Sequence, residues 1–310
     1  MALLLPPLGG LTYSLVGPGR VGTSLACWLA ESGGSLIDVA GRSDKAVQDL
    51  ATRLDGETVE VENLSSENED LLLIAVTDSA LADVAATLAR HPQAKVALHT
   101  SGHQSAAILE PLGRQGTATG TLHPLKAFPD ILPAASAAAG SVFAVDGDAE
   151  AQQMARRLVA AWSGEAVEIP AESRPLYHLA ASLAAGGVVT LLATACDLAR
   201  GAGLPEAVGR GYLELARGAL DQTQGLGDPA AAITGPVARG DLETLETQLG
   251  RLQGADPERA ALVTALARET LRHRRRRGEL DSTHEALESF LEEIGDRYKF
   301  LLPKRPTRRR

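Results

Sequence analysis

Aromatic residues and cysteines are scarce in this chain of 310 residues. Phe, Trp and Tyr make up 3% of the sequence, and Cys27 and Cys196 are its two cysteines. We therefore expect a core of small aliphatic side chains, which suits helices packed closely on a parallel sheet. Two cysteines far apart in apolar stretches exclude a disulfide framework and a metal-ligand cluster, so no metal site is predicted. This cysteine usage is typical of a reducing cytosol and predicts a cytoplasmic protein.

Net positive charge is also lacking. The formal net charge is −9 at pH 7, which argues against nucleic acid as the main partner. Two basic patches, at 274–277 and 304–310, are interpreted as a solvated helix face and a frayed terminus, with a nucleic-acid arm as the alternative. The first ten residues have no basic stretch and a very short apolar run. They predict neither a secretory signal nor a membrane span, and no membrane partner is expected.

From residue 11 to about residue 170, short apolar runs alternate with segments of helical periodicity. This alternation is typical of βαβ units and predicts a Rossmann-type, doubly wound parallel sheet of the α/β class. The run at 71–76 is almost uniformly apolar, as expected of a central strand covered on both faces. The predicted strands are 11–16, 36–40, 59–61 (the weakest), 71–76, 95–99, 119–123 and 141–145, and the predicted helices include one ending at 30, 46–54 and 78–90.

The pattern changes near residue 170, after which nothing predicts a strand. A long Ala- and Leu-rich run at 174–202 has apolar residues at helical spacing, and later segments are separated by Gly and Pro. We predict a dinucleotide-binding domain at 1–168, a helical dimerisation and substrate domain at 169–300, and a disordered basic tail at 301–310. The helix at 176–198 is too hydrophobic to be covered on one side only, which favours a homodimer.

A glycine-rich loop follows the first predicted strand. Its sequence Gly17-Pro18-Gly19-Arg20-Val21-Gly22 fits G-x-G-x-x-G and opens an Ala/Leu-rich helix. In dinucleotide-binding folds the first glycine permits the turn, the second lets the backbone approach the pyrophosphate, and the third lets helix and strand pack closely. We therefore predict that this loop binds a dinucleotide. The alternative is a glycine-rich turn without a ligand.

The end of the second predicted strand bears on which dinucleotide binds. An NAD site usually has an acidic residue there, about 20 residues after the loop, to bind the ribose 2′-hydroxyl. Here Gly41-Arg42-Ser43 occupies the turn, which offers a guanidinium and a hydroxyl to a 2′-phosphate. NADP(H) is therefore predicted over NAD(H); alternatively Arg42 is an ordinary exposed loop residue. Val76-Thr77-Asp78 ends a central strand beside the expected cofactor ribose, although Asp78 is also a candidate helix N-cap.

Four segments carry a resemblance to known proteins: His99-Thr100-Ser101-Gly102, Leu122-His123-Pro124-Leu125, Tyr177-His178-Leu179-Ala180-Ala181, and Thr234 to Asp241. Over about residues 12–295 the chain resembles the two-domain reductases of the 6-phosphogluconate dehydrogenase-like superfamily. Its N-terminal half is similar to pyrroline-5-carboxylate reductase and to deazaflavin-dependent NADP oxidoreductases. The closer resemblance is to a bacterial family that pairs a Rossmann-like domain with a helical C-terminal domain of unknown function. The resemblance implies a 6-phosphogluconate dehydrogenase C-terminal-like helical domain that dimerises, with a cleft facing the Rossmann domain.

Three residues are candidates for catalysis. Ser101 and His123 follow or end predicted strands at the carboxyl edge of the sheet, where ligands bind in such folds. His178 opens the long helix, where the resemblance implies a Lys as acid and an Asn nearby; His can donate and accept a proton near neutral pH. His178 and Ser182 are spaced to share a helix face, whereas Gly186 and Gly187 stand where the family often has Asn. A structural role is the alternative for each candidate.

These features predict an NADP(H)-dependent oxidoreductase that transfers a hydride to or from a small carbonyl, imine or hydroxyacid substrate. The absent Lys and Asn favour the alternative, a catalytically inactive dinucleotide-binding sensor or scaffold protein. In the segment 234–241, Arg239 and Asp241 are expected to pair with each other or, for Arg239, to reach an anionic substrate.

Overall fold

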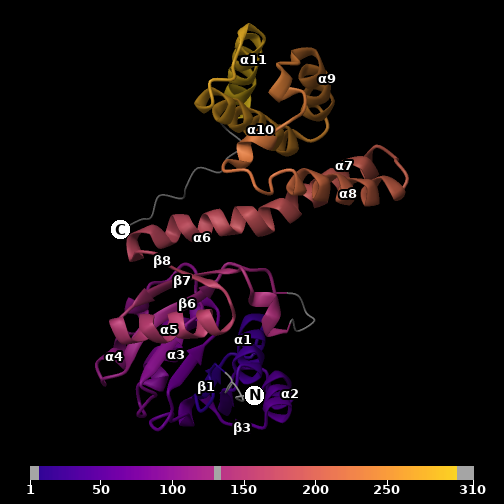
Figure 1. Cartoon of the computed structure of the whole chain (residues 1–310). Helices are drawn as coiled ribbons and strands as arrows, with labels where there is room; N and C mark the ends of the chain where they lie inside the picture. Colours follow the sequence, from indigo (N-terminus) through magenta and orange to yellow (C-terminus); the bar gives the residue numbers. More distant parts are fainter. Residues whose placement is uncertain (1–6, 129–133, 299–310) are drawn as a thin grey trace, which may run out of the picture. The chain divides into compact units, whose positions relative to one another are not determined.

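A computed structural model describes residues 7–128 and 134–298, which form two compact units (Figure 1). The first unit covers residues 1–191 and the second residues 192–310. The sheet ends at Glu168, but the helix that follows packs with the first unit. The domain boundary expected at 168/169 therefore stays a prediction. The basic tail at 301–310 lies outside the described residues.

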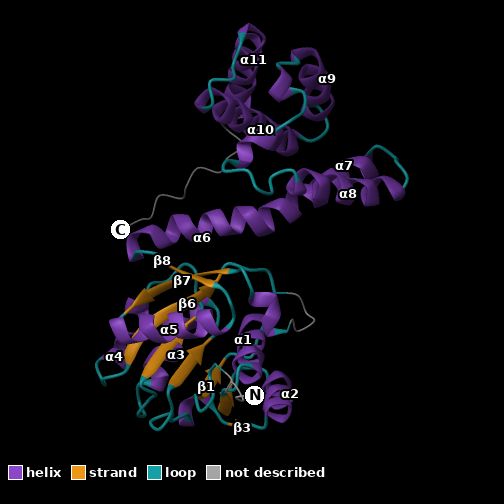
Figure 2. Ribbon diagram, in the orientation of Figure 1, coloured by secondary structure: helices purple, strands orange, loops and turns teal. Residues whose placement is uncertain are grey.

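The first unit is built on an eight-stranded sheet, whose strands Figure 2 shows in orange. The spatial order is β3-β2-β1-β4-β5-β6-β7-β8, and its first six strands have the arrangement of dinucleotide-binding folds. All neighbouring pairs are parallel except β6 and β7. The strands are β1 (Thr12–Val16), β2 (Ser35–Ala40), β3 (Glu57–Thr58), β4 (Leu71–Ile74), β5 (Val96–His99), β6 (Ala118–Pro124), β7 (Val142–Gly147) and β8 (Glu165–Glu168).

Helices cover both faces of this sheet, which confirms the predicted doubly wound architecture. One apolar cluster joins the sheet to α1, α2 and α5, and a second joins its other face to α3 and α4. The central strand β4 contributes to both clusters because its side chains alternate between the two faces. These helices are α1 (Arg20–Glu31), α2 (Asp44–Leu54), α3 (Asp78–Leu88), α4 (Glu110–Gly113) and α5 (Ala149–Ala161), with the short turns η1 (Val61–Asn63), η2 (Ala106–Leu109), η3 (Ala135–Ala138) and η4 (Ala171–Ser173).

The sheet differs from the expected one at its two edges. Strand β7 runs antiparallel to β6, because the chain returns between them without the long helical crossover that a parallel neighbour needs. The weak strand expected at 59–61 lies at 57–58 instead, and Val61 begins the turn η1. Strand β8 was not predicted, since its two apolar residues, Ala166 and Val167, stand between two exposed glutamates and show no alternation.

Several of the few aromatic side chains pack together in one cluster within the core. Trp28 packs against Phe128 and Trp162, with ring centroids 5.6 Å apart in each pair, and Phe143 lies at the same distance from Trp162. The indole Nε1 of Trp162 donates to the Trp28 carbonyl over 3.3 Å. The expectation of a purely small aliphatic core is therefore corrected at this cluster, which ties α1 to α5.

After the sheet, the chain continues as one long apolar helix interrupted by a π-helical turn. It comprises α6 (Arg174–Ser182), η5 (Leu183–Gly187) and α7 (Val188–Gly201). Its large apolar side chains stand largely exposed, with Leu176 74% and Val189 66% exposed. By length and composition, Ala171–Gly201 is one helix that could cross a membrane. No membrane span was predicted from the sequence, and one such helix is weak evidence for a span.

The second unit contains only helices among its described residues, as predicted. Its core joins α9, α10 and α11 through Leu245, Leu249, Leu271, Leu287 and Leu291. Most of the arginines at 274–277 form ion pairs with acidic residues, which agrees with a solvated helix face. The remaining elements are α8 (Ala207–Asp221), η6 (Pro229–Ala232), η7 (Val237–Arg239), α9 (Leu242–Gln253), α10 (Pro257–Arg276) and α11 (Ser282–Tyr298).

The segment 234–241 is a structural turn within this second unit. Asp241 caps α9 by accepting hydrogen bonds from the backbone N–H and the hydroxyl of Thr244. These bonds, with help from the charge of Arg239, lower the pKa of Asp241, and an ion pair between the two residues stays a prediction. Gly240 has φ +70°, and any side chain there would collide with Thr283. Buried His284 donates a hydrogen bond from its Nε2 to the Ala238 carbonyl over 3.3 Å. These contacts explain the local sequence pattern by packing.

Candidate functional site

The glycine loop has the geometry that a dinucleotide needs. Gly17 has φ +95°, and a Cβ on Gly22 would lie 2.2 Å from the Gly17 carbonyl oxygen, so loop, strand and helix pack closely. A Cβ on Gly19 would meet nothing within 4 Å. Gly19 is also the N-cap of α1 and has no side chain to satisfy the first N–H groups of the helix. The loop therefore leaves open space in front of a helix N-terminus, which suits a phosphate.

A cavity of about 410 Å³ extends from this loop to the ends of β2 and β4. We call it the glycine cradle. It gathers most of the predicted cofactor residues, while Arg20, Val21, Gly22 and Asp78 do not line it. Those that do are Gly17, Pro18, Gly19, Gly41, Arg42, Ser43, Val76 and Thr77.

Two charged lining residues of the cradle were missed by sequence reasoning. Glu60 and Glu62 reach it from η1, a turn that was expected to be a strand. Exposed Arg42 faces the same cavity, and the Ser43 hydroxyl caps α2 by accepting from Ala46 N–H. The cradle therefore offers one guanidinium and two carboxylates to the adenosine half of a dinucleotide.

Of the residues that follow β4, some line the cradle and one belongs to the first turn of α3. Thr77 is the N-cap of α3, and Asp78 occupies the first turn, so Asp78 is not the cap itself. A carboxylate in the first turn of a helix is favoured by the helix dipole. Asp78 therefore has a structural reason for its place, and Thr77 and Val76 are the ones that line the cradle.

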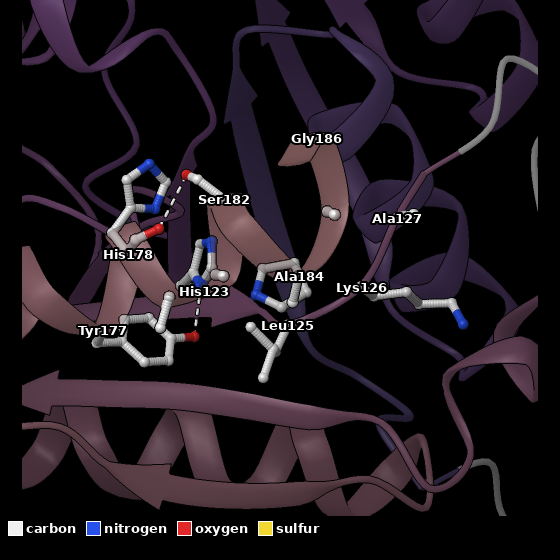
Figure 3. A pocket seen from close by; sticks show the side chains of 13 residues that line it. His123, Leu125, Lys126, Ala127, Tyr177, His178, Ser182, Ala184 and Gly186 are labelled. Carbon is white, nitrogen blue, oxygen red and sulfur yellow. Dashed lines mark hydrogen bonds between the residues drawn. The ribbon is translucent and has the colours of Figure 1, made fainter. Parts of the chain in front are cut away.

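The second cavity of interest lies between the end of β6, with the residues that follow it, and the helical segments α6 and η5 (Figure 3). We call it the histidine cleft, and its volume is about 820 Å³. Its wall is mostly small and apolar, Lys126 is its one lining residue with a permanent charge, and none of the thirteen is a carboxylate. The lining residues are His123, Pro124, Leu125, Lys126, Ala127, Tyr177, His178, Ala180, Ala181, Ser182, Ala184, Ala185 and Gly186.

Two predicted catalytic residues, 55 positions apart in sequence, meet in this cleft. A Cβ added to Gly102 would lie 2.6 Å from His178 Nδ1 and 2.7 Å from His123 Nε2. The two ring nitrogens therefore converge on the space beside Gly102, and the ring centroids are 6.0 Å apart. Only glycine fits between them, which explains the residue at this point of the loop.

His123 is held by a neighbour that sequence reasoning did not assign. The Tyr177 hydroxyl lies 2.8 Å from His123 Nδ1, as the dashed line in Figure 3 shows, and the rings meet edge to face at 5.5 Å. Burial, with help from His178 and Arg174, lowers the pKa of His123 to about 4. Burial also raises the pKa of Tyr177. At neutral pH the pair therefore consists of an uncharged imidazole and a protonated phenol.

His178 lies in the cleft with one nitrogen unused. Its Nδ1 is buried and has no hydrogen-bond partner among the described residues. The Ser182 hydroxyl donates to the backbone carbonyl of His178 over 2.9 Å, so it does not serve the imidazole as the shared helix face suggested. Because an unsatisfied buried nitrogen is costly, a bound group that pairs with His178 would stabilise the cleft.

Ser101 lies within the loop after β5 and not in the cleft. Its hydroxyl accepts hydrogen bonds from the backbone N–H groups of His103 and Gln104, at 3.2 and 2.9 Å. Its own N–H donates to His99 Nδ1, while His99 Nε2 faces the Ser105 carbonyl at 3.1 Å. The loop after β5 is thus braced from within, and Ser101 does not line the cleft.

Arg174 fastens this loop to the start of α6 and was missed by sequence reasoning. Its side chain is fully buried and donates to the carbonyls of Ser101 and Gln104 and to the Thr121 hydroxyl. It also lies 3.4 Å from an Asp146 carboxylate oxygen. A charged residue beside Pro175, at the head of an apolar helix, was the available sequence clue. These contacts fix where Tyr177 and His178 stand against the sheet.

Among the described residues no group of three or more His, Cys, Asp or Glu side chains could hold a metal ion.

The fold and these two cavities define a two-domain protein with a Rossmann-like α/β domain and a helical C-terminal region. Family models agree: a Rossmann-like domain matches residues 9–124, and a domain of unknown function, DUF2520, matches residues 141–270. The chain thus belongs to the proteins that pair these two domains, as the sequence resemblance implied. The second model begins within the sheet, at β7. A search of curated proteins found no match to the sequence.

Solved structures share this fold at low sequence identity. A candidate NADP oxidoreductase from Bacteroides fragilis has 21% identity and a TM-score of 0.71, covering 85% of this chain and 98% of that one. A Plasmodium falciparum pyrroline carboxylate reductase with NADP bound has 14% identity and a TM-score of 0.55, covering 93% and 98%. An imine reductase from Streptomyces aurantiacus has 16% identity and a TM-score of 0.54, covering 90% and 99%. These similarities establish the fold.

Proposed function

We propose that this chain is an NADP(H)-dependent oxidoreductase acting on a small carbonyl, imine or hydroxyacid substrate. The observation that carries the proposal is the vacant space at Gly19, in front of the uncapped N-terminus of α1 and inside the glycine cradle. The similar structures from Bacteroides fragilis and Plasmodium falciparum are described as an NADP oxidoreductase and as a reductase with NADP bound, which supports the choice of cofactor.

The residues of the cradle would hold the cofactor by its phosphates. The backbone of Gly17 to Gly19 and the first turn of α1 would bind the pyrophosphate, and Arg42 would pair with the 2′-phosphate. NADP(H) supplies or accepts the hydride in such a reaction. The chain's own task at the histidine cleft is to orient the substrate, exclude water and move a proton, for which His123 and His178 are the candidates.

Calorimetric titration with NADPH and NADH, on the wild type and on Arg42→Ala, tests the proposal. We expect micromolar NADPH binding that weakens about tenfold in Arg42→Ala, since a lost charge-assisted contact costs about 1.5 kcal/mol. Arg53→Ala, an exposed arginine of α2 outside the cradle, is the matched control and should bind as the wild type does. No binding of either dinucleotide would mean that the loop is only a turn, and the oxidoreductase proposal would be abandoned.

The second candidate function is a catalytically inactive dinucleotide-binding sensor or scaffold. It is favoured by the π-turn at 183–187, where Gly186 and Gly187 stand in place of a polar residue, and by Ser101 being fully engaged in its loop. Such a protein would bind NADPH as above but would reduce no compound in a panel of ketones, oxo acids and cyclic imines between pH 5 and 9. Turnover of any of them above the cofactor's background oxidation would exclude it.

We further propose that the exposed apolar face of the long helix is covered by a second copy of this chain. Leu176, Leu179, Leu183 and Val189 are more than half exposed on α6 to α7, which would be costly in water over a contiguous helix. Light scattering after gel filtration should give a dimer, and Leu179→Asp with Leu183→Asp should give a monomer. Association of the wild type with lipid vesicles in place of dimerisation would contradict this proposal and the predicted cytoplasmic location.

A further inference from the structure

The proposed function leaves open whether the reacting group is a carbonyl or an imine, and the hydrogen-bonding direction in the histidine cleft separates the two. A carbonyl oxygen accepts hydrogen bonds. A cyclic imine or amine is protonated near neutral pH and therefore only donates them. The cleft must present a donor to the first and an acceptor, preferably with negative charge, to the second.

Tyr177 determines which nitrogen of His123 carries the proton. Its hydroxyl is protonated, and His123 Nδ1, 2.8 Å away, is the one acceptor in reach among the described residues. If Nδ1 carried the imidazole proton, the half-buried phenol would lose that acceptor, at a cost of about 1 kcal/mol or more. Tyr177 therefore donates to Nδ1, and the proton of the neutral imidazole lies on Nε2.

That nitrogen faces Gly102 in the loop after β5. His123 Nε2 lies 2.7 Å from the point where Gly102 would carry a Cβ, and no hydrogen bond within the described chain engages it. His178 Nδ1, on the other side of the same point, is also without a partner. His123 lines the cleft, so a substrate atom that reaches its Nε2 meets an N–H donor from β6.

The charges around the cleft disfavour a cation as well. None of its lining residues is a carboxylate, and Lys126 extends at the side of the cleft away from His178 (Figure 3). Buried Arg174 contributes further positive potential, which helps to lower the pKa of His123. Asp78 acts in the opposite direction on His123, but less than Arg174 does. A protonated imine would therefore enter a positive, donor-lined site.

We propose, on the basis of the function above, that the cleft binds a neutral or anionic carbonyl compound and its alcohol, with Tyr177 as the positioning residue that makes His123 an Nε2–H donor. Reduction would add a hydride, which NADPH would supply with both electrons, to the carbonyl carbon and a proton to its oxygen. His123 Nε2 gives that proton while Nδ1 takes the hydroxyl proton of Tyr177. Solvent then protonates Nε2, and Nδ1 returns its proton to Tyr177, with net uptake of one proton.

The first test is the tautomer of His123, measured by nitrogen-15 NMR of the histidine rings in the full chain without cofactor. We expect a neutral ring with its proton on Nε2 at pH 7, and a mixture of tautomers in Tyr177→Phe. Tyr212→Phe, a tyrosine of α8 outside the cleft, should leave the signal unchanged. A ring protonated on Nδ1, or an imidazolium, would overturn the proposal. Because this measurement needs no cofactor, it is independent of whether NADPH binds.

The second test compares two ligands that share one skeleton, decalone and protonated decahydroisoquinoline, on the NADP⁺-loaded protein. Decalone should shift the His123 Nε2 signal, and the cation should shift it at least tenfold less at equal concentration. A larger response to the cation, or no response to either, would overturn the assignment.

Substitutions of His123 test which of its two ring nitrogens acts on the substrate. His123→Gln retains an N–H donor near the position of Nε2, and it should keep more carbonyl reduction than His123→Asn does. Equal losses would contradict a donor role for Nε2.

Discussion

The glycine cradle and the histidine cleft lie in the same unit but are built from different parts of the fold. The cradle is lined by the segments that follow β1, β2, β3 and β4, four neighbouring strands of the sheet, and its glycines leave the space that a ligand would use. The cleft is made of two stretches that are far apart in sequence, 123–127 at and after the end of β6 and 177–186 on α6 and η5. The cradle should therefore tolerate changes elsewhere in the chain, whereas the cleft depends on whatever holds α6 against the sheet.

Arg174 gives the sharpest test of that dependence. Arg174→Met removes the hydrogen bonds to the loop after β5 and leaves Asp146 without its buried partner, so we expect a loss of about 3 kcal/mol of unfolding free energy. Urea unfolding measures it. Arg156→Met, which breaks an exposed ion pair with Glu168, is the control and should cost less than about 1 kcal/mol.

The two cavities should respond differently to the same Arg174 change. At temperatures where Arg174→Met is folded, NADPH affinity should stay within about twofold of the wild type. The His123 ring should no longer hold its proton on Nε2 alone, and any turnover should be abolished. If NADPH affinity fell as much as turnover did, the two cavities would not be separable, and the comparison would fail.

This difference in construction also explains how much could be predicted from sequence. The glycine motif and the Gly41–Ser43 turn are local, so spacing alone indicated most of the cradle. Glu60 and Glu62 were missed because the weak apolar pattern at 59–61 was interpreted as a strand. In the cleft, residue type and strand ends indicated His123 and His178. Their convergence on Gly102, the pairing of Tyr177 with His123 and the burial of Arg174 depend on tertiary packing, which no sequence spacing encodes.

A side chain at Gly19 tests whether the open space in front of α1 binds a phosphate. Its backbone is extended and its Cβ direction is empty, so Gly19→Val should fold with wild-type stability. Its side chain would fill the space in front of α1, and NADPH should bind about 100-fold more weakly, by calorimetry. Gly22→Val is the contrasting variant, because its Cβ would collide with the Gly17 carbonyl and should destabilise the fold itself. Wild-type NADPH affinity in folded Gly19→Val would contradict phosphate binding at this loop.

Glu69 is a buried carboxyl group that lines neither the cradle nor the cleft, and it makes the stability of the fold depend on pH. Its side chain is 6% exposed, Oε1 accepts from the Ser14 hydroxyl, and Oε2 has no partner among the described residues. Burial, with repulsion from Asp38 and Asp70, raises its pKa to about 7. The folded state therefore holds a proton that the unfolded chain releases near pH 4.5. The stability from this group is complete below pH 4.5 and is lost as pH rises through about 7.

Glu69→Gln removes this pH dependence. The variant should match the wild type at pH 4.5 and exceed its unfolding free energy by on the order of 2 kcal/mol at pH 8, measured by urea unfolding at each pH. Glu67→Gln, an exposed neighbour, should show no such pH-dependent gain. A Glu69→Gln variant less stable than the wild type at pH 8 would mean that the carboxylate is charged and satisfied in the folded state.

The smallest effect concerns the two carboxylates of the cradle and decides between the dinucleotides. Glu60→Gln with Glu62→Gln removes negative charge from the cavity that Arg42 lines, so NADPH should bind two- to threefold more tightly, at about 0.5 kcal/mol for exposed charges. The gain should shrink at high salt, and Glu57→Gln, outside the cradle, should not produce it. NADH affinity should stay constant, because it has no 2′-phosphate to repel. If NADH binding weakened instead, these carboxylates would bind the ribose hydroxyls, and Arg42 would not select the cofactor.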